Sequence, residues 1–136
     1  MRVFHWSCVS ELVPGREQVA DTLAAIRCVS HERNRELGIT GTLIFTGQRF
    51  AQYLEGSQAS LALLRGSIER DPRHTGLVTI AEGPAARRRL NQWDLSYAGQ
   101  SSFVDQIVER AVRDAAGSAR ARLVRLLVEL AAGDAD

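Results

Sequence analysis

Gln52 is the residue of this chain whose type and surroundings most suggest chemistry. Residues 38–56, GITGTLIFTGQRFAQYLEG, are typical of two strands joined by a tight turn, because apolar and β-branched residues flank a turn-forming sequence. The two-residue period of a strand puts Gln52 on one face with Phe50 and Leu54. A buried amide costs about 1–3 kcal/mol for each group without a partner. Gln52 therefore indicates a polar ligand or a partner within the protein; the alternative is an edge strand with a solvated glutamine.

Other polar side chains are expected to converge on Gln52 from three elements. They are His5 on an opening strand, Ser30 and Asn34 on one face of a first helix, and Arg73 and His74 at the end of a second helix. Asparagine and glutamine supply both donors and acceptors. A cleft between two helices and a sheet, lined by amides and apolar groups, suits a flat heteroaromatic ligand with carbonyl and imide edges. Taken alone, His5 is more typical of a core histidine than of a catalyst.

Composition and motifs argue against several functional classes. The net charge of +1 gives no bulk attraction for nucleic acid or for an anionic membrane. Cys8 and Cys28 lack the spacing of a metal site or of a disulfide framework. No catalytic triad, phosphate-binding glycine loop or carboxylate pair stands out, so we predict that the chain is not an enzyme. The run Arg87-Arg88-Arg89 is more typical of a solvated surface than of a recognition patch.

Length and hydropathy predict a single compact unit. The 136 residues are 45% hydrophobic, which is ordinary for a soluble globular protein. The N-terminus is too short and polar for a signal sequence, and no apolar run reaches membrane-spanning length. We therefore expect a cytoplasmic protein.

The opening strand, residues 2–10, is expected to have two distinct faces. Alternation gives one face with Val3, His5 and Ser7 and another with Phe4, Trp6 and Cys8. Periodicity predicts the later elements as helices over 16–36 and 58–70, paired strands over 39–46 and 50–54, strands over 77–81 and 93–97, and two amphipathic helices after residue 101.

This order of elements predicts an α+β fold with a ferredoxin-like βαββαββ sheet. The two crossover helices are expected on one face of the sheet. The opposite face, which should carry Phe4, Trp6 and Tyr53, is then covered by two C-terminal helices of the same or of a partner subunit. We accordingly divide the chain into a ligand-binding domain over 1–98 and a C-terminal helical extension over 99–136 that belongs to the same compact unit.

The chain resembles the BLUF family of blue-light sensors that use FAD. The resemblance runs from about residue 2 to residue 97 and consists of several motifs in the same order. They are VFHWS in the opening strand, SHERNRELGITG at the end of the first helix, FAQYLEG in the central strand, DPRH after the second helix, and Arg88 with Trp93 near the last strand.

The resemblance implies a ferredoxin-like domain that binds FAD between its two helices. Asn34 matches the asparagine that bonds the pyrimidine edge of the flavin, and Gln52 matches the glutamine that rearranges after light absorption. In the family, a tyrosine of the first strand gives an electron to the excited flavin, and a proton moves through the glutamine. Further matches are Ser30 and Ile26 along the ring, Arg73 and His74 near the nucleotide, and Trp93 in the mobile region near the last strand.

The chain departs from the family pattern in the first strand. If Ser7 matches the family serine, His5 stands at the position of the tyrosine. Histidine can bond Gln52 and carry protons, but it is a poorer electron donor, so we expect an atypical photocycle. Trp93 is another candidate donor, as is Trp6 if a bulge reverses the strand.

Output is expected to pass through protein–protein contacts to a downstream signalling protein, with no direct role for nucleic acid, and the protein is expected to be a homo-oligomer. The alternative function is a degenerate regulatory or oligomerisation module of the same fold, without flavin or a light response. A small flavin-dependent enzyme is a third and weaker possibility, because no substrate site or acid–base pair is evident.

Overall fold

The structure, a computed structural model, describes residues 2–13, 19–115 and 117–132. Its elements in chain order are β1 (Val3–Leu12), α1 (Val19–Leu37), β2 (Thr40–Phe45), β3 (Arg49–Gly56), α2 (Gln58–Arg70), β4 (His74–Ala85), β5 (Trp93–Ala98), α3 (Ser102–Arg113) and α4 (Gly117–Ala132). The predicted start of the first helix at residues 16–18 and the last four residues of the predicted extension lie outside the described residues.

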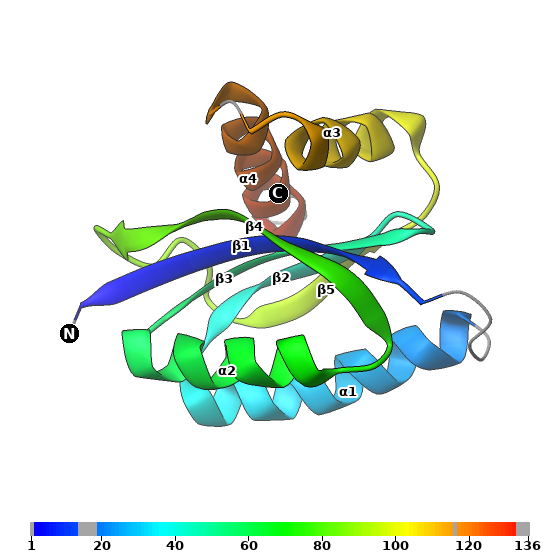
Figure 1. Ribbon diagram of the computed structural model, residues 1–136. Helices are drawn as coiled ribbons and strands as arrows, with labels where there is room; N and C mark the ends of the chain where they lie inside the picture. The colour runs from blue at the N-terminus through cyan, green and yellow to red at the C-terminus, as the bar shows by residue number, and fades with distance from the viewer. Residues whose placement is uncertain (1, 14–18, 116, 133–136) are drawn as a thin grey trace.

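The five strands form one sheet in the order β4-β1-β3-β2-β5. Neighbouring strands are antiparallel except β2 and β5, which are parallel. Helices α1 and α2 cover one face of the sheet, and α3 and α4 cover the other (Figure 1). The predicted ferredoxin-like α+β architecture is therefore confirmed, and the C-terminal helices of the same chain cover the second face.

Two hydrophobic cores lie on the two faces of this sheet. The core under α1 and α2 contains Trp6, Cys8, Phe50 and Leu54, and the core under α3 and α4 contains Tyr53. The expectation that Trp6 and Phe4 share the face of Tyr53 is wrong. Trp6 pairs with Leu54 across β1 and β3, and directly paired residues of an antiparallel ladder point to the same side.

β4 is longer than expected. The sequence predicts a strand over 77–81 followed by a turn at Gly83-Pro84, whereas β4 continues through both residues to Ala85. Proline cannot donate to a ladder, but β4 lies at the edge of the sheet, where one side of the strand needs no donor.

Gly41 allows β2 to approach β3 closely. Its φ is +154°, and a Cβ at this position would overlap the carbonyl oxygen of Tyr53. Gly41 also pairs with Trp93 on its other side, so the close approach helps to place the start of β5. Among the described residues, no helix is long and apolar enough to cross a membrane.

Candidate functional site

A pocket of about 630 Å³ lies between α1, the end of α2 and the adjoining face of the sheet. Six of the seven predicted cofactor-binding residues line it: Ile26, Ser30, Asn34, Gln52, Arg73 and His74. Helix α1 contributes the first three, β3 contributes the fourth, and the segment after α2 contributes the last two. The structure thus brings together residues that lie up to 48 positions apart, from Ile26 to His74.

Asn34 is positioned by the way in which α1 ends. Its carbonyl accepts from the backbone N–H of Ile39 at 2.8 Å, and Gly38 takes a φ of +70° to allow this closure. The side chain of Asn34 is 1% exposed, and its Oδ1 has no hydrogen-bond partner among the described residues. A buried acceptor without a donor is costly, so this amide is suited to a ligand that supplies an N–H group.

Gln52 lies in the middle of the sheet and not on an edge strand. β3 is flanked by β1 and β2, and Gln52 pairs with Cys8 on one side and Leu43 on the other. Its half-buried side chain lines the pocket and makes no hydrogen bond to another described residue. The edge-strand part of the alternative for Gln52 is therefore wrong.

Arg73 and His74 line the pocket just after the end of α2, next to Asp71. The guanidinium of Arg73 binds both carboxyl oxygens of Asp71, with Nη2 to Oδ2 at 2.7 Å and Nε to Oδ1 at 2.9 Å. Burial alone would raise the pKa of Asp71, but the hydrogen bonds from Arg73 outweigh it and lower that pKa. Burial also lowers the pKa of His74, which keeps its imidazole neutral near pH 7.

His5 and Ser7 lie on the opposite face of the sheet. His5 pairs with Glu55, and its ring stacks on Tyr53 with centroids 6.2 Å apart. Ser7 pairs with Tyr53 and is fully buried there. The β1–β3 register places His5 and Ser7 on the face of the sheet opposite to that of Gln52. The expectation that His5 faces Gln52 is therefore wrong.

Cys8 is the β1 residue that faces Gln52. It is the direct cross-strand partner of Gln52 and is 2% exposed. Burial raises the pKa of its thiol to about 12, against a weaker opposing effect of Arg65, so the thiol stays protonated. Ser10, two residues further along the strand, lines the pocket itself. The two-residue period predicts that Trp6, Cys8 and Ser10 share one face of β1. It does not predict whether that face meets α1 and α2 or the C-terminal helices.

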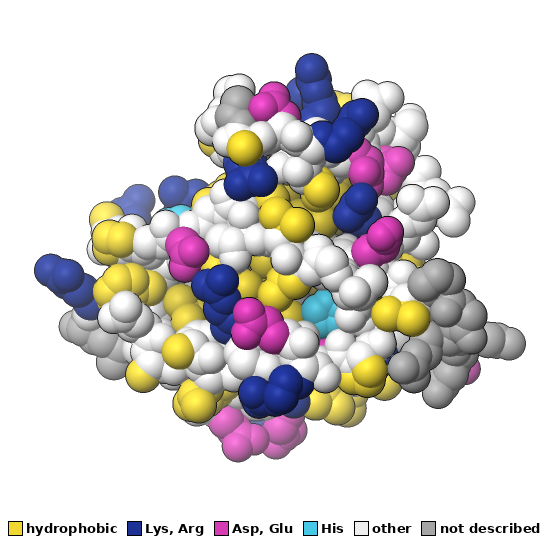
Figure 2. Space-filling view, viewed as in Figure 1, with side chains coloured by type: hydrophobic (Ala, Val, Ile, Leu, Met, Phe, Trp, Pro, Cys, Tyr) yellow, Lys and Arg dark blue, Asp and Glu magenta, His cyan; other side chains and the backbone are white. Residues whose placement is uncertain are grey.

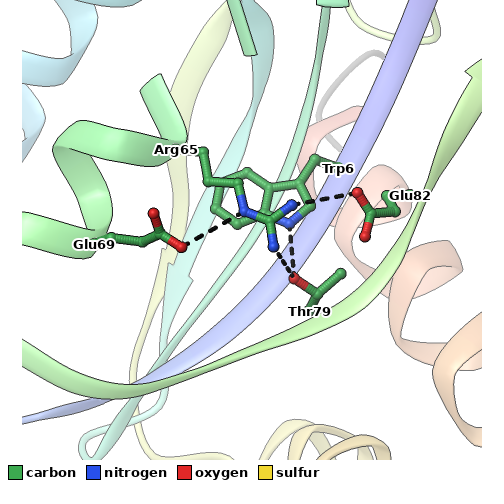
Figure 3. Close-up of polar contacts among 5 residues, drawn as sticks. All are labelled: Trp6, Arg65, Glu69, Thr79 and Glu82. Carbon is green, nitrogen blue, oxygen red and sulfur yellow. Dashed lines mark hydrogen bonds and ion pairs between the residues drawn. The ribbon is translucent and has the colours of Figure 1, made fainter. Parts of the chain in front are cut away.

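Two tryptophans are buried in the core under α1 and α2. Trp93 is 3% exposed, and its Nε1 has no hydrogen-bond partner among the described residues. Trp6 is held by a polar cluster: its Nε1 donates to Thr79 Oγ1 at 3.0 Å, and Arg65 lies over its ring at 4.9 Å from the centroid. Figure 3 shows the same arginine bound to Glu69, Thr79 and Glu82.

The comparison with protein families decides the identity of this fold. The family described as "BLUF: Sensors of blue-light using FAD" matches residues 3–96. The chain belongs to the BLUF family. The match runs from the start of β1 into β5, and this range includes every pocket-lining residue described above.

Curated BLUF-containing relatives are much longer than this chain. The photoactivated adenylate cyclase subunit alpha of Euglena gracilis is 31% identical over 90 residues, which are 66% of this chain and 8% of that protein. The blue light- and temperature-regulated antirepressor BluF of Escherichia coli (strain K12) is 32% identical over 82 residues, 60% of this chain and 19% of that protein. The chain thus spans less than a tenth of the length of the cyclase subunit.

Solved BLUF structures match almost the whole chain. The dark-state structure of the BLUF protein BlrB has a TM-score of 0.74 at 25% identity and covers 97% of this chain and 96% of its own. The photo-activated state of BlsA, at 17% identity, has a TM-score of 0.77 over 93% of this chain and 94% of its own, and this likeness concerns the fold alone. Because the BLUF family is one of sensors, residues 3–96 form a sensor domain and not a catalytic domain.

Proposed function

We propose that this chain binds FAD in the α1–α2 pocket and acts as a blue-light sensor. The observation that carries the proposal is the pair of amides, Asn34 and Gln52, in one pocket with apolar walls from Ile26, Val29 and Leu43. The buried Oδ1 of Asn34 matches the N–H of a flavin imide, and apolar walls suit the flat ring. The residues present therefore fit the group that the family description names.

In the proposed complex, the six predicted residues that line the pocket fall into three pairs with different roles. Asn34 and Gln52 bind the pyrimidine edge, Ile26 and Ser30 line the ring, and Arg73 and His74 lie near the nucleotide. Arg73 is held in place by Asp71, which orients its charge before a ligand arrives. The bound flavin supplies absorption of blue light and, once excited, one-electron oxidation.

The proposed light response depends on Gln52 and its neighbours. Reversal of the amide exchanges a donor for an acceptor, which changes the bonds that β3 makes without moving a helix. The group that faces Gln52 from β1 is the protonated thiol of Cys8, a weak hydrogen-bond donor. The photocycle is therefore atypical because a thiol, and not the imidazole of His5, takes the place of the family tyrosine.

The electron donor that we propose is Trp93. Cys8 is buried and protonated, which makes it unreactive. Trp6 lies under the guanidinium of Arg65, whose positive charge opposes removal of an electron from the ring. No arginine stacks on Trp93 among the described residues, so its ring is the more easily oxidised of the two.

The decisive experiment is the absorption spectrum of the purified protein, reconstituted with FAD, before and during blue illumination. We expect a flavin spectrum that shifts reversibly to the red. Asn34→Ala should bind FAD about tenfold or more weakly, because a buried hydrogen bond is lost. Asn91→Ala, in an exposed loop, is the matched control. Equal FAD binding by both variants would contradict the proposed role of Asn34.

A second candidate function is a BLUF-fold regulatory or oligomerisation module without a light response. The observation in its favour is Cys8, because a protonated thiol opposite Gln52 cannot replace a tyrosine as donor. Failure of the wild-type protein to take up FAD would establish this alternative over the sensor. Bound flavin without a spectral shift would keep the cofactor and remove the light response.

We further propose that the output passes through protein contacts of α3 and α4. Two relatives are by name an adenylate cyclase subunit and an antirepressor, so the same domain type serves different outputs. Phe103 on α3 is 59% exposed and is a candidate contact residue. A cytoplasmic location and a homo-oligomeric state remain predictions; size-exclusion chromatography with light scattering would test the latter.

A further inference from the structure

A second pocket, of about 860 Å³, lies on the face of the sheet opposite the flavin pocket. Its floor is formed by His5 of β1 and Tyr53 of β3, and α4 contributes Val124 and Val128. The end of β4 and the run Arg87–Arg89 complete the rim. In Figure 2, dark-blue side chains and a histidine lie close together near the end of β4, below α4.

The arginine run is held in a defined place by its backbone. The N–H groups of Arg89 and Leu90 donate to the carboxyl group of Glu55, at 2.9 Å and 2.7 Å for their shortest bonds. Glu55 is fully buried and belongs to β3, the central strand. The run is therefore attached to the sheet and presents its side chains at a fixed position beside the pocket.

Two of the three arginines have guanidinium groups that are not taken up by hydrogen bonds within the described residues, and none of the three forms an ion pair there. Arg88 is occupied, because its guanidinium donates to the carbonyls of Gly38 and Glu55 and to Thr40 Oγ1. Arg87 and Arg89 form no ion pair with another described residue. The described pocket lining contains no aspartate or glutamate, in contrast to the flavin pocket, which has Asp21 and Asp71.

His5 adds a buried polar atom to this cationic rim. Its Nδ1 is buried and has no hydrogen-bond partner among the described residues. Burial and the charge of Arg89 lower the pKa of His5, while Glu55 and Glu82 oppose this shift. Glu82 itself forms an ion pair with Arg65 of α2. A neutral imidazole can donate or accept one hydrogen bond at this position.

We propose that this second pocket binds a small organic anion, with a carboxylate or phosphate between Arg87 and Arg89 and an apolar body between Tyr53 and α4. Guanidinium groups bind both anions through paired hydrogen bonds, and Val124 and Val128 of α4 supply an apolar surface beside the buried ring of Tyr53, over which Arg89 lies at 6.0 Å from the centroid. This site is separate from the flavin pocket and does not depend on flavin binding.

The test is isothermal titration calorimetry of the full chain, reconstituted with FAD where FAD binds, with four probes. Benzoate and phenyl phosphate combine an anion with an apolar ring, inorganic phosphate lacks the ring, and benzamide lacks the charge. We expect benzoate or phenyl phosphate to bind and benzamide not to bind. Binding of only one of the two identifies the anion as carboxylate or phosphate, and inorganic phosphate should bind more weakly than phenyl phosphate.

Matched variants separate a site from general surface charge. Arg89→Gln should weaken binding of the ring-bearing anion about tenfold, because a charge-assisted hydrogen-bond pair is lost. Arg113→Gln removes the same charge from the exposed end of α3 and should have no effect. Equal weakening by both variants, or equal binding of benzamide and benzoate, would overturn the proposal.

A measurement on the wild-type protein covers the case in which Arg89→Gln fails to fold. The ring ¹⁵N resonances of His5 should shift on addition of benzoate or phenyl phosphate and stay in place with benzamide. An unchanged His5 resonance at saturation would overturn the proposed location of the site.

Discussion

Cys8 and Gln52 are direct partners across β1 and β3, and the photocycle that we propose depends on this pair. A tyrosine at position 8 would bring a phenol, which can bond the amide and give up an electron. The thiol has a pKa of about 12 and does neither well. The β1–β3 register therefore favours residue 8 over residue 5 as the place where the proposed photocycle departs from the family pattern.

Cys8→Tyr should create or accelerate the red-shifted light state, because it places a phenol opposite Gln52. His5→Tyr is the matched control, since it introduces the same phenol on the far face of the sheet and should leave the spectrum unchanged. Overpacking at the buried position 8 costs about 1–3 kcal/mol, so thermal unfolding and flavin content must be measured beside the light-minus-dark spectrum. A response in the His5 variant alone would reverse our assignment of the two faces.

Gln52→Leu should retain flavin and lose the light-minus-dark difference, because leucine has a similar volume and no amide to reverse. Gln92→Leu, at an exposed position before β5, is the control. An unaltered difference spectrum in Gln52→Leu would exclude the proposed role, provided that the wild type responds.

Trp93→Phe should reduce the yield of the light state at least about tenfold if Trp93 is the donor, because phenylalanine is much harder to oxidise. Trp6→Phe should have a small effect on the yield, since Arg65 already disfavours oxidation of Trp6. Transient absorption in both variants measures the difference. A larger loss in the Trp6 variant would assign the donor to the Arg65 cluster.

Residue types and spacing were sufficient to predict most of the pocket-lining residues. They did not predict which residues of β1 face α1 and α2. Asn34 and Gln52 could be found because amides are unusual on apolar faces. His5 was misplaced because alternation defines two sets of residues without saying which set faces which layer. That choice depends on the pairing of Cys8 with Gln52, a contact between segments 44 residues apart.

At the scale of elements, Glu55 connects β3 to the segment that leads into β5. Its buried carboxyl group accepts from Tyr53 Oη at 2.9 Å, Thr40 Oγ1 at 2.9 Å and the backbone N–H groups of Arg89 and Leu90. The sequence pattern alone does not reveal this role of Glu55, because its partners come from several separate segments of the chain. All four groups donate to this one carboxyl group. A side chain with fewer acceptor oxygens at position 55 would therefore leave a donor without a partner and lower the free energy of unfolding.

Glu55→Gln should lower the free energy of unfolding by about 1–3 kcal/mol, because an NH₂ group then faces N–H and O–H donors. Glu82→Gln is the matched control, since Glu82 is exposed and its bond to Arg65 lies at the surface. Urea unfolding measures both variants. A loss no greater than that of Glu82→Gln would mean that the four bonds to Glu55 contribute little.

At the scale of the whole molecule, the half-buried His74 links stability to pH. Burial lowers the pKa of His74 below its ordinary value of 6.5, so the folded state binds fewer protons than the unfolded state. The contribution of His74 to the free energy of unfolding is fully present above about pH 6.5. It is lost as the pH falls from 6.5 through the lower pKa of His74 in the folded state. Asp71, whose pKa is also lowered, acts only in a more acidic range, below 3.8.

His74→Gln should therefore flatten the loss of stability that begins as the pH falls below about 6.5, as measured by urea unfolding at a series of pH values. His31→Gln, on the exposed side of α1, should leave the slope unchanged. An unchanged slope in His74→Gln would show that His74 takes up a proton in the folded state as readily as in the unfolded chain.

Successive residues of β3 form part of the two pockets: Gln52 lines one, and Tyr53 lines the other. The two sites are thus separated by the sheet alone, with β3 contributing to both. Any energetic coupling between them is reciprocal. An anion that binds one state of the flavin pocket more tightly than another must stabilise that state by the same factor. In the proposed light-responsive complex with both ligands bound, illumination would then release or capture the anion, and the anion concentration would set how long the illuminated state persists.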